Sequence, residues 1–157
     1  MTFILLRASQ DLLHMAEALD VDNIEISEWC SRLREGIETL RNPHGGFFNA
    51  INCRTDEHSG NITSASFLNW YAGIDDDETL KILTKTLEET RYPTPSLSIN
   101  SEKFDGMRYW RGPTWAILNS LVGVGLYEMG HLAEARLLRN RTQSLIIEKG
   151  FAEYFHP

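Results

Sequence analysis

Two motifs near the end of the sequence combine residue types that could do chemistry. Residues 109–115 read YWRGPTW and bring three aromatic rings, a guanidinium, a glycine and a proline into seven positions. Residues 150–157 read GFAEYFHP and set the carboxylate of Glu153 among three aromatic side chains. Aromatic faces beside a carboxylate are typical of a sugar-binding site, because the rings offer flat apolar surfaces and the carboxylate accepts hydrogen bonds. The sequence ends four residues after Glu153, so we expect the site to be only partly present.

The composition is that of a single-domain globular protein. With 157 residues, 42% of them hydrophobic and 24% charged, the chain can bury a core, and we expect one domain over residues 1–157. Its net charge of −7 argues against nucleic acid or an anionic membrane as a partner. No apolar stretch approaches the roughly 20 uncharged residues of a membrane span, and residues 1–6 lack the features of a signal peptide. These observations predict a cytoplasmic protein.

The cysteines and histidines give no sign of a metal or redox site. Cys30 and Cys53 lack CxxC spacing, which favours two free thiols in a reducing compartment over a disulfide. The five histidines form neither an HxxxH nor an HExxH pattern. We therefore expect no metal and no cofactor.

Apolar residues recur at helical spacing along most of the chain. The pattern predicts six helices, over residues 2–19, 26–40, 64–71, 77–87, 112–127 and 132–148, and the third could also begin at Ser66. Thr2 is the expected cap of the first helix, residues 75–77 are the expected cap of the fourth, and Pro113 is the expected first residue of the fifth. Gly130 and Gly150 are expected to end the last two helices.

The fifth predicted helix, residues 112–127, contains no charged residue. A helix that is apolar on all sides is expected to be buried on all sides. Trp29 in the second helix and Trp70 near the end of the third are also predicted core residues. Six helices in three antiparallel pairs predict an all-α fold of the α/α type.

Two stretches of the chain lack helical periodicity. Residues 45–61 are polar and glycine-rich, and Phe47, Phe48 and Ile51 could form a short strand there, which predicts a β-hairpin-like loop near 46–63. Residues 91–108 form a long loop that holds Pro93 and Pro95. Long loops without periodicity in a compact domain are often functional.

The two C-terminal motifs, in this order and at this spacing, resemble the C-terminal portion of glycoside hydrolase family 63. The nearest resemblance is to the bacterial branch of mannosylglycerate and glucosylglycerate hydrolases. It is strongest over residues 96–157 and continues more weakly to Met1. It implies a fold of antiparallel helix pairs that makes up about half of an (α/α)6 toroid.

The resemblance also implies roles for individual residues. Enzymes of this family invert the anomeric centre with two carboxylic acids, and Glu153 falls at the position of the general base. Tyr109, Trp110, Arg111, Gly112 and Trp115 fall at the sugar-binding loop. The family's general acid is an aspartate in an earlier part of the barrel that has no counterpart here, and Asp105 is a weak substitute. The resemblance therefore implies a truncated domain that is inactive alone.

Other interpretations of the same residues stay open. The chain could be a non-catalytic module that binds carbohydrate or another protein, or one chain of a split glycosidase. Trp110 and Trp115 could simply pack at a helix entrance, since tryptophan is highly buried on average. Glu153 could lie on a frayed end. Enzymatic activity is therefore left undecided, and a small sugar or glycoside is the expected ligand.

Half a toroid would leave its terminal helices with apolar flanks in water, and such patches usually mark interfaces. Two-fold pairing is the commonest way for identical chains to bury them. We therefore expect a homodimer. Its interface would use either the first helix, through Leu5, Leu12 and Met15, or the fifth helix.

Overall fold

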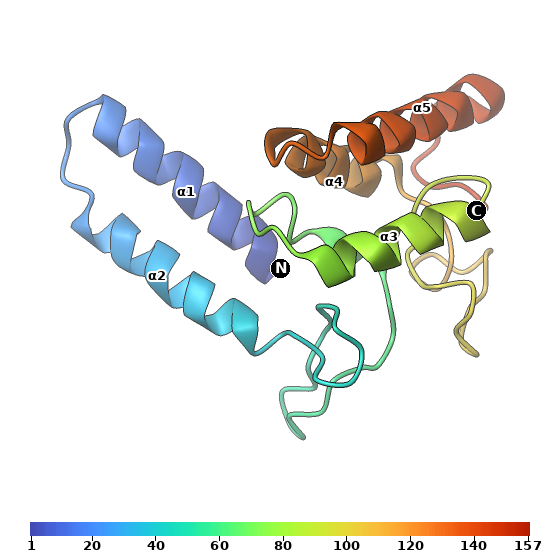
Figure 1. The fold of residues 1–157 in the computed structure, drawn as a ribbon, viewed down its shortest axis with the longest axis horizontal. Helices are drawn as coiled ribbons and strands as arrows, with labels where there is room; N and C mark the ends of the chain where they lie inside the picture. Colours follow the sequence, from blue (N-terminus) through green and yellow to red (C-terminus); the bar gives the residue numbers. More distant parts are fainter.

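The computed structural model describes all 157 residues, from Met1 to Pro157. Five α-helices and one four-residue 3-10 turn carry the fold (Figure 1). In chain order they are α1 (Thr2–Ala18), α2 (Ile24–Glu38), η1 (Ser64–Phe67), α3 (Asp77–Glu89), α4 (Ala116–Glu128) and α5 (Leu132–Lys149). Extended segments meet only at isolated bridges and form no strand. The all-α fold predicted from the sequence is confirmed.

The helices form two hairpins and a single helix. α1 packs along α2, and α4 packs along α5. α3 packs instead against η1, and η1 in turn contacts α4. In Figure 1 the α1–α2 hairpin extends to one side of the molecule, while α3, α4 and α5 gather on the other.

The core is centred on the segment that contains η1. Its apolar side chains meet those of α3, α4 and α5, and the aromatic ring of Phe48 joins them from the loop before η1. Leu6 of α1 and Ile37 of α2 also belong to this core. Its most deeply buried members are Leu6, Ile37, Phe48, Phe67, Trp70, Ala72, Leu83, Leu87, Val122, Leu126 and Leu138. The predicted burial of Trp70 is therefore confirmed.

A glycine in α4 allows the helix to lie directly on the main chain of the core segment. A Cβ atom on Gly125 would lie 2.2 Å from the carbonyl carbon of Trp70 and 2.4 Å from the nitrogen of Tyr71. Only glycine permits so close an approach of two backbones. This contact fixes the height of α4 above the core, and with it the position of the loop that precedes α4.

The predicted helix signals at three positions are confirmed. Asp76 is the N-cap of α3, and its carboxylate accepts a hydrogen bond from the Thr79 N–H at 2.7 Å. Gly130 and Gly150, with φ of +88° and +79°, follow the ends of α4 and α5 in conformations that other residues rarely adopt. α3 ends without a glycine, and the Arg141 guanidinium instead donates to the carbonyls of Leu87 and Thr90.

Three predicted helix boundaries are wrong. Thr2 already lies inside α1, whose N-cap is Met1, so its hydroxyl caps nothing. The helix expected over 64–71 is only the 3-10 turn η1, so the chain has five α-helices and no third helix pair. α4 begins at Ala116, not at residue 112, because residues 112–115 are held in extended pairing with other segments.

Two predictions of burial are also wrong. α4 is not buried on all sides, because Ile117, Val124 and Tyr127 are exposed on the face that turns away from the core. Trp29 lies on the outer side of α2 and is 37% exposed. In both cases the apolar side chain faces a side of the helix that no other segment of the chain covers.

The loop after α2 has the hairpin-like shape expected near 46–63. Ile51 and His58 form an antiparallel bridge, and a turn at Asp56, with φ of +56°, connects the two sides. The His58 ring bonds to the Asn49 side chain at 2.7 Å. Among the helices, none has the length and apolar character needed to cross a lipid bilayer.

Candidate functional site

Three distant segments meet beside the start of α4 and build the candidate site. Thr114 pairs with Pro95 on one side and with Phe155 on the other. Its N–H and carbonyl exchange hydrogen bonds of 2.8 and 2.9 Å with Phe155, and its hydroxyl donates to the Pro93 carbonyl at 2.9 Å. This pairing brings residues 109–115 and 150–157 together, although about forty positions separate them.

The aromatic rings of the two motifs form one cluster. Trp110 and Trp115 stack with centroids 4.1 Å apart and planes 4° apart. Trp115 is buried beneath, and Trp110 is exposed above it. The Tyr109 ring stands edge-on to both indoles and to Tyr154, with centroids 4.8 to 5.9 Å apart. The cluster presents an exposed indole face next to a phenol hydroxyl.

Glu153 joins this cluster through Tyr109. The Tyr109 hydroxyl donates a hydrogen bond of 2.5 Å to Oε1 of Glu153. This bond, together with partial loss of solvent and the nearby negative charge, raises the pKa of Tyr109 above its ordinary value. The hydroxyl therefore keeps its proton and stays a donor at neutral pH.

The surroundings of Glu153 differ from those expected from its neighbours in sequence. The side chain is exposed, not buried among Phe151, Tyr154 and Phe155. Phe151 is 96% exposed, and Phe155 turns inward to pack with Tyr92 and Leu145. The rings near Glu153 come mainly from residues 109–115, and Tyr154 is the only one of its flanking aromatics in the cluster.

Arg111 and Gly112 shape the loop beneath the rings. The Arg111 side chain is exposed and donates from Nε to the Lys103 carbonyl at 3.0 Å, which leaves its terminal nitrogens free for a ligand. A Cβ on Gly112 would lie 2.6 Å from the backbone oxygen of Asp105 and 2.8 Å from the Cα of Gly106. Gly112 is therefore needed for the close packing of the loop backbone at residue 112 against residues 105 and 106.

Buried polar side chains hydrogen-bond to the backbone of the segment that carries the aromatic cluster. Asn119 accepts a hydrogen bond from the Thr94 hydroxyl and donates to the Trp115 carbonyl at 3.1 Å. Ser96 accepts the Gly112 N–H at 3.1 Å. Sequence reasoning did not identify Thr94 and Ser96, because single polar residues in a loop without periodicity carry no signal of burial.

Asp105 is occupied by contacts within its own loop. Its carboxylate accepts the Met107 N–H at 3.0 Å and lies 3.7 Å from Nε of Arg108. No group of three or more His, Cys, Asp or Glu side chains is arranged to hold a metal ion.

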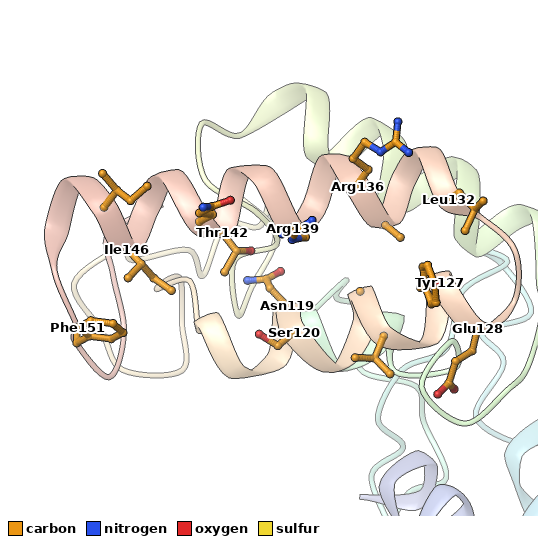
Figure 2. A pocket seen from close by; sticks show the side chains of 15 residues that line it. Asn119, Ser120, Tyr127, Glu128, Leu132, Arg136, Arg139, Thr142, Ile146 and Phe151 are labelled. Carbon is orange, nitrogen blue, oxygen red and sulfur yellow. The ribbon is translucent and has the colours of Figure 1, made fainter.

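A separate groove of about 880 Å³ runs between α4 and α5. Figure 2 shows Ser120 and Tyr127 of α4 facing Thr142 and Ile146 of α5 across it, with Phe151 at one end. None of the six predicted site residues lines this groove. The candidate site and the groove are therefore distinct features of the molecule.

The fold is that of glycoside hydrolase-like domains of the helical-toroid type. The structure superposes on the GH63 mannosylglycerate hydrolase from Thermus thermophilus in complex with glucose with a TM-score of 0.94 and 34% identity, over 99% of this chain and 41% of that one. It also matches the neutral trehalase Nth1 from Saccharomyces cerevisiae with a TM-score of 0.76 and 18% identity, which shows the shared fold alone. The five helices correspond to about half of the (α/α)6 toroid.

The family model for the mannosylglycerate hydrolase MGH1-like glycoside hydrolase domain matches residues 1–157, and the chain belongs to this family. It is 35% identical to the mannosylglycerate hydrolase of Thermus thermophilus over 158 residues and 31% identical to mannosylglycerate hydrolase MGH1 of Selaginella moellendorffii over 160. These alignments cover 98% of this chain but only 38% and 33% of the two relatives.

Proposed function

We propose that the chain carries the general-base side of the sugar site of an inverting α-glycosidase. The hydrogen bond between Tyr109 and Glu153, made beside the exposed face of Trp110, is the observation that carries this proposal. A carboxylate, a phenol donor and a flat apolar surface then lie within reach of a single sugar ring. A positioned carboxylate of this kind can activate a water molecule for attack on the anomeric carbon.

Each residue then has a distinct role. Glu153 accepts the proton of the attacking water, and Tyr109 holds the carboxylate in place. The exposed indole of Trp110, backed by Trp115, packs against the sugar ring. Arg111 offers its free terminal nitrogens to a polar or anionic group of the substrate. Gly112 lets the loop turn closely enough to present these side chains together.

The proposed substrate is a small α-glycoside such as mannosylglycerate. The relatives that carry this name span more than twice the length of the aligned region, so the substrate remains part of the proposal. An exposed cluster with a cation beside it suits a sugar that bears a carboxylate on its aglycone.

Inversion also needs a general acid, with the two carboxyl groups roughly 6.5–9.5 Å apart. Asp105 is engaged with Met107 and Arg108, so we do not assign it this role. Loss of a positioned acid typically lowers the rate by about 10² to 10⁴. We therefore propose that the 157-residue chain binds sugar without turning it over, and that a general acid from another polypeptide segment completes the enzyme.

A non-catalytic carbohydrate-binding role is the second candidate. Tyr109, Trp110 and Glu153 are all exposed, which suits weak binding on an open surface. This role uses the same residues, but it does not require Glu153 to act as a base.

A titration with mannosylglycerate and methyl α-mannoside, followed by two-dimensional NMR, tests sugar binding. We expect millimolar affinity, with shifts at Tyr109, Trp110 and Arg111, because an incomplete site must offset the ordering cost with few contacts. Trp110→Ala should abolish the shifts. Trp29→Ala is the matched control, because Trp29 is exposed on α2, away from the cluster. No shift at these residues with either sugar would refute the proposal.

A further inference from the structure

α1 carries a regular apolar stripe on its exposed side. Its members follow one another at alternating intervals of three and four residues, which is the a/d spacing of a coiled coil. They are Met1, Leu5, Ala8, Leu12, Met15 and Leu19, and we call them the α1 seam. All six are exposed, and the five larger side chains are 43–86% accessible to solvent.

The fold itself does not use the α1 seam. The residues that α1 buries are Phe3, Leu6 and Ala16, which lie on a different side of the helix. At about 100° per residue, the buried side and the seam point roughly 140° apart. Figure 1 shows the α1–α2 hairpin extending away from α4 and α5, so α1 keeps a free flank along its length.

We propose that the α1 seam binds the α1 seam of a second copy of this chain, with the two helices antiparallel across a two-fold axis. The axis crosses the helix pair at the level of residue 10, between Ala8 and Leu12 of each seam. In this register, residue n of one helix lies opposite residue 20 − n of the partner helix. Leu12 faces the partner's Ala8, Leu5 faces the partner's Met15, and Met1 faces the partner's Leu19.

This register matches side-chain sizes across the interface. The small Ala8 meets the large Leu12 in two symmetric layers at the centre, where a void would cost most. A parallel pairing would instead place Ala8 against Ala8 and leave a gap in that layer. The antiparallel order also satisfies the alternation of a and d positions, because every a residue meets a d residue of the partner.

The charges along the α1 seam permit this contact although each chain carries a net charge of −7. The positions that flank the stripe are Thr2, Ile4, Ser9, Asp11, Ala16 and Ala18, of which only Asp11 is charged. The two-fold axis places the partner's Asp11 on the same flank, about 3 Å away along the helix axes, and each Asp11 is paired with Arg7 of its own helix at 3.0 Å. The Arg7–Asp11 ion pair on each helix offsets this one like-charge approach, and no other charged residue flanks the seam.

The exposed apolar area of the α1 seam is large enough for an interface with a second copy of the chain. At ordinary residue areas the exposed fractions of its residues correspond to about 600–700 Å² per chain, which is the most that the stripe can bury, against roughly 800 Å² per partner in a standard interface. A contiguous patch of this size exceeds what most monomers expose. Val21 and Ile24 at the tip of the hairpin are also exposed and extend the same apolar edge.

Sedimentation velocity at about 100 µM tests the assembly, and we expect a dimer. Leu12→Glu should weaken the dimer at least 100-fold, because it places two carboxylates at the centre of the apolar contact. Val124→Glu in the α4–α5 groove is the matched control, since Val124 is 45% exposed and Leu12 is 43% exposed. It should leave the dimer intact, and circular dichroism should show both variants folded. A monomeric wild type, an unchanged Leu12→Glu dimer, or dissociation by Val124→Glu would each overturn the proposal.

Disulfide cross-linking tests the orientation in a Cys53→Ser background, which removes the exposed thiol and keeps the buried Cys30. The double variant Ala8→Cys, Leu12→Cys should form a covalent dimer under mild oxidation. Ala8→Cys alone should not, because in the antiparallel register the two copies of position 8 are about 6 Å apart along the axis in addition to the separation of the helices, which exceeds disulfide reach. Efficient cross-linking of Ala8→Cys alone would refute the antiparallel register.

Discussion

Gly112→Ala should disrupt the candidate site through a backbone clash. The added Cβ would lie 2.6 and 2.7 Å from the carbonyl oxygen and carbon of Asp105, and 2.8 Å from the Cα of Gly106. These are main-chain atoms, so no side-chain rotation can relieve the contact. The Asp105 N–H donates to the Arg111 carbonyl at 2.7 Å, and separating the two loop strands would break that bond.

The expected cost follows from overpacking and from the lost hydrogen bond. Overpacking typically costs about 1–3 kcal/mol, and a backbone hydrogen bond contributes about 1 kcal/mol. We therefore expect the free energy of unfolding to fall by about 2–4 kcal/mol. For a domain of this length the melting temperature should fall by about 4–16 °C.

Urea denaturation followed by circular dichroism measures this loss, with Gly36→Ala as the control. Gly36 lies inside α2, and a Cβ there meets nothing within 4 Å, so the same substitution should stabilise the helix by about 0.5–1 kcal/mol. The free energy of unfolding should thus fall in Gly112→Ala and rise in Gly36→Ala. A Gly112→Ala variant within about 0.5 kcal/mol of the wild type, with unchanged NMR signals for Tyr109 and Trp110, would refute the reasoning.

Two further predictions concern the scaffold. Burial raises the pKa of Asp76, but hydrogen bonds from Arg41 and the Thr79 N–H outweigh it and hold the pKa below its ordinary value. Its stabilising effect is therefore complete above about pH 4 and is lost as pH falls through the lowered pKa. Below about pH 4, the free energy of unfolding should therefore fall less steeply with decreasing pH in Asp76→Asn than in Asp77→Asn, a variant at the exposed neighbouring position. Equal slopes in the two variants would contradict this. Arg141→Ala removes the donors to the last carbonyls of α3, and thermal or urea unfolding should show a free energy of unfolding lower by about 1–3 kcal/mol. Arg139→Ala loses no hydrogen bond or ion pair, so its free energy of unfolding should stay within about 0.5 kcal/mol of the wild type.

Local signals in the sequence predicted those features whose causes are local. Asp76 caps α3 with its own side chain, and Gly130 and Gly150 take up the conformations that end α4 and α5. The start of α4 could not be found in this way. Pro113 suits the first turn of a helix, but Thr114 next to it pairs with Pro95 and Phe155. Both partners are far from Thr114 in the sequence, so no local pattern indicates this pairing.

The burial of α4 failed as a prediction for a similar reason. Helical periodicity shows that residues 112–127 are apolar, but it does not show which sides another segment covers. Val124 and Tyr127 are exposed because they line the open groove beside α5, and Ile117 is exposed outside that groove.

The motifs identified the members of the candidate site, but not their arrangement. Tyr109, Trp110, Trp115 and Glu153 do come together. The neighbours of Glu153 could not be read from the sequence, because adjacent residues in an extended segment face opposite sides. Phe155 consequently turns into the core while Tyr154 joins the exposed cluster.

An exchange of segments tests most directly whether Glu153 is the base of a glycosidase site. The Thermus thermophilus mannosylglycerate hydrolase aligns with 98% of this chain, so residues 1–157 can replace the matching region of that enzyme. We predict that the chimera hydrolyses mannosylglycerate, and that Glu153→Gln in the chimera lowers kcat by about 100-fold or more while binding is retained. A folded chimera whose activity is unchanged by Glu153→Gln, or one that binds mannosylglycerate without hydrolysing it, would contradict the account.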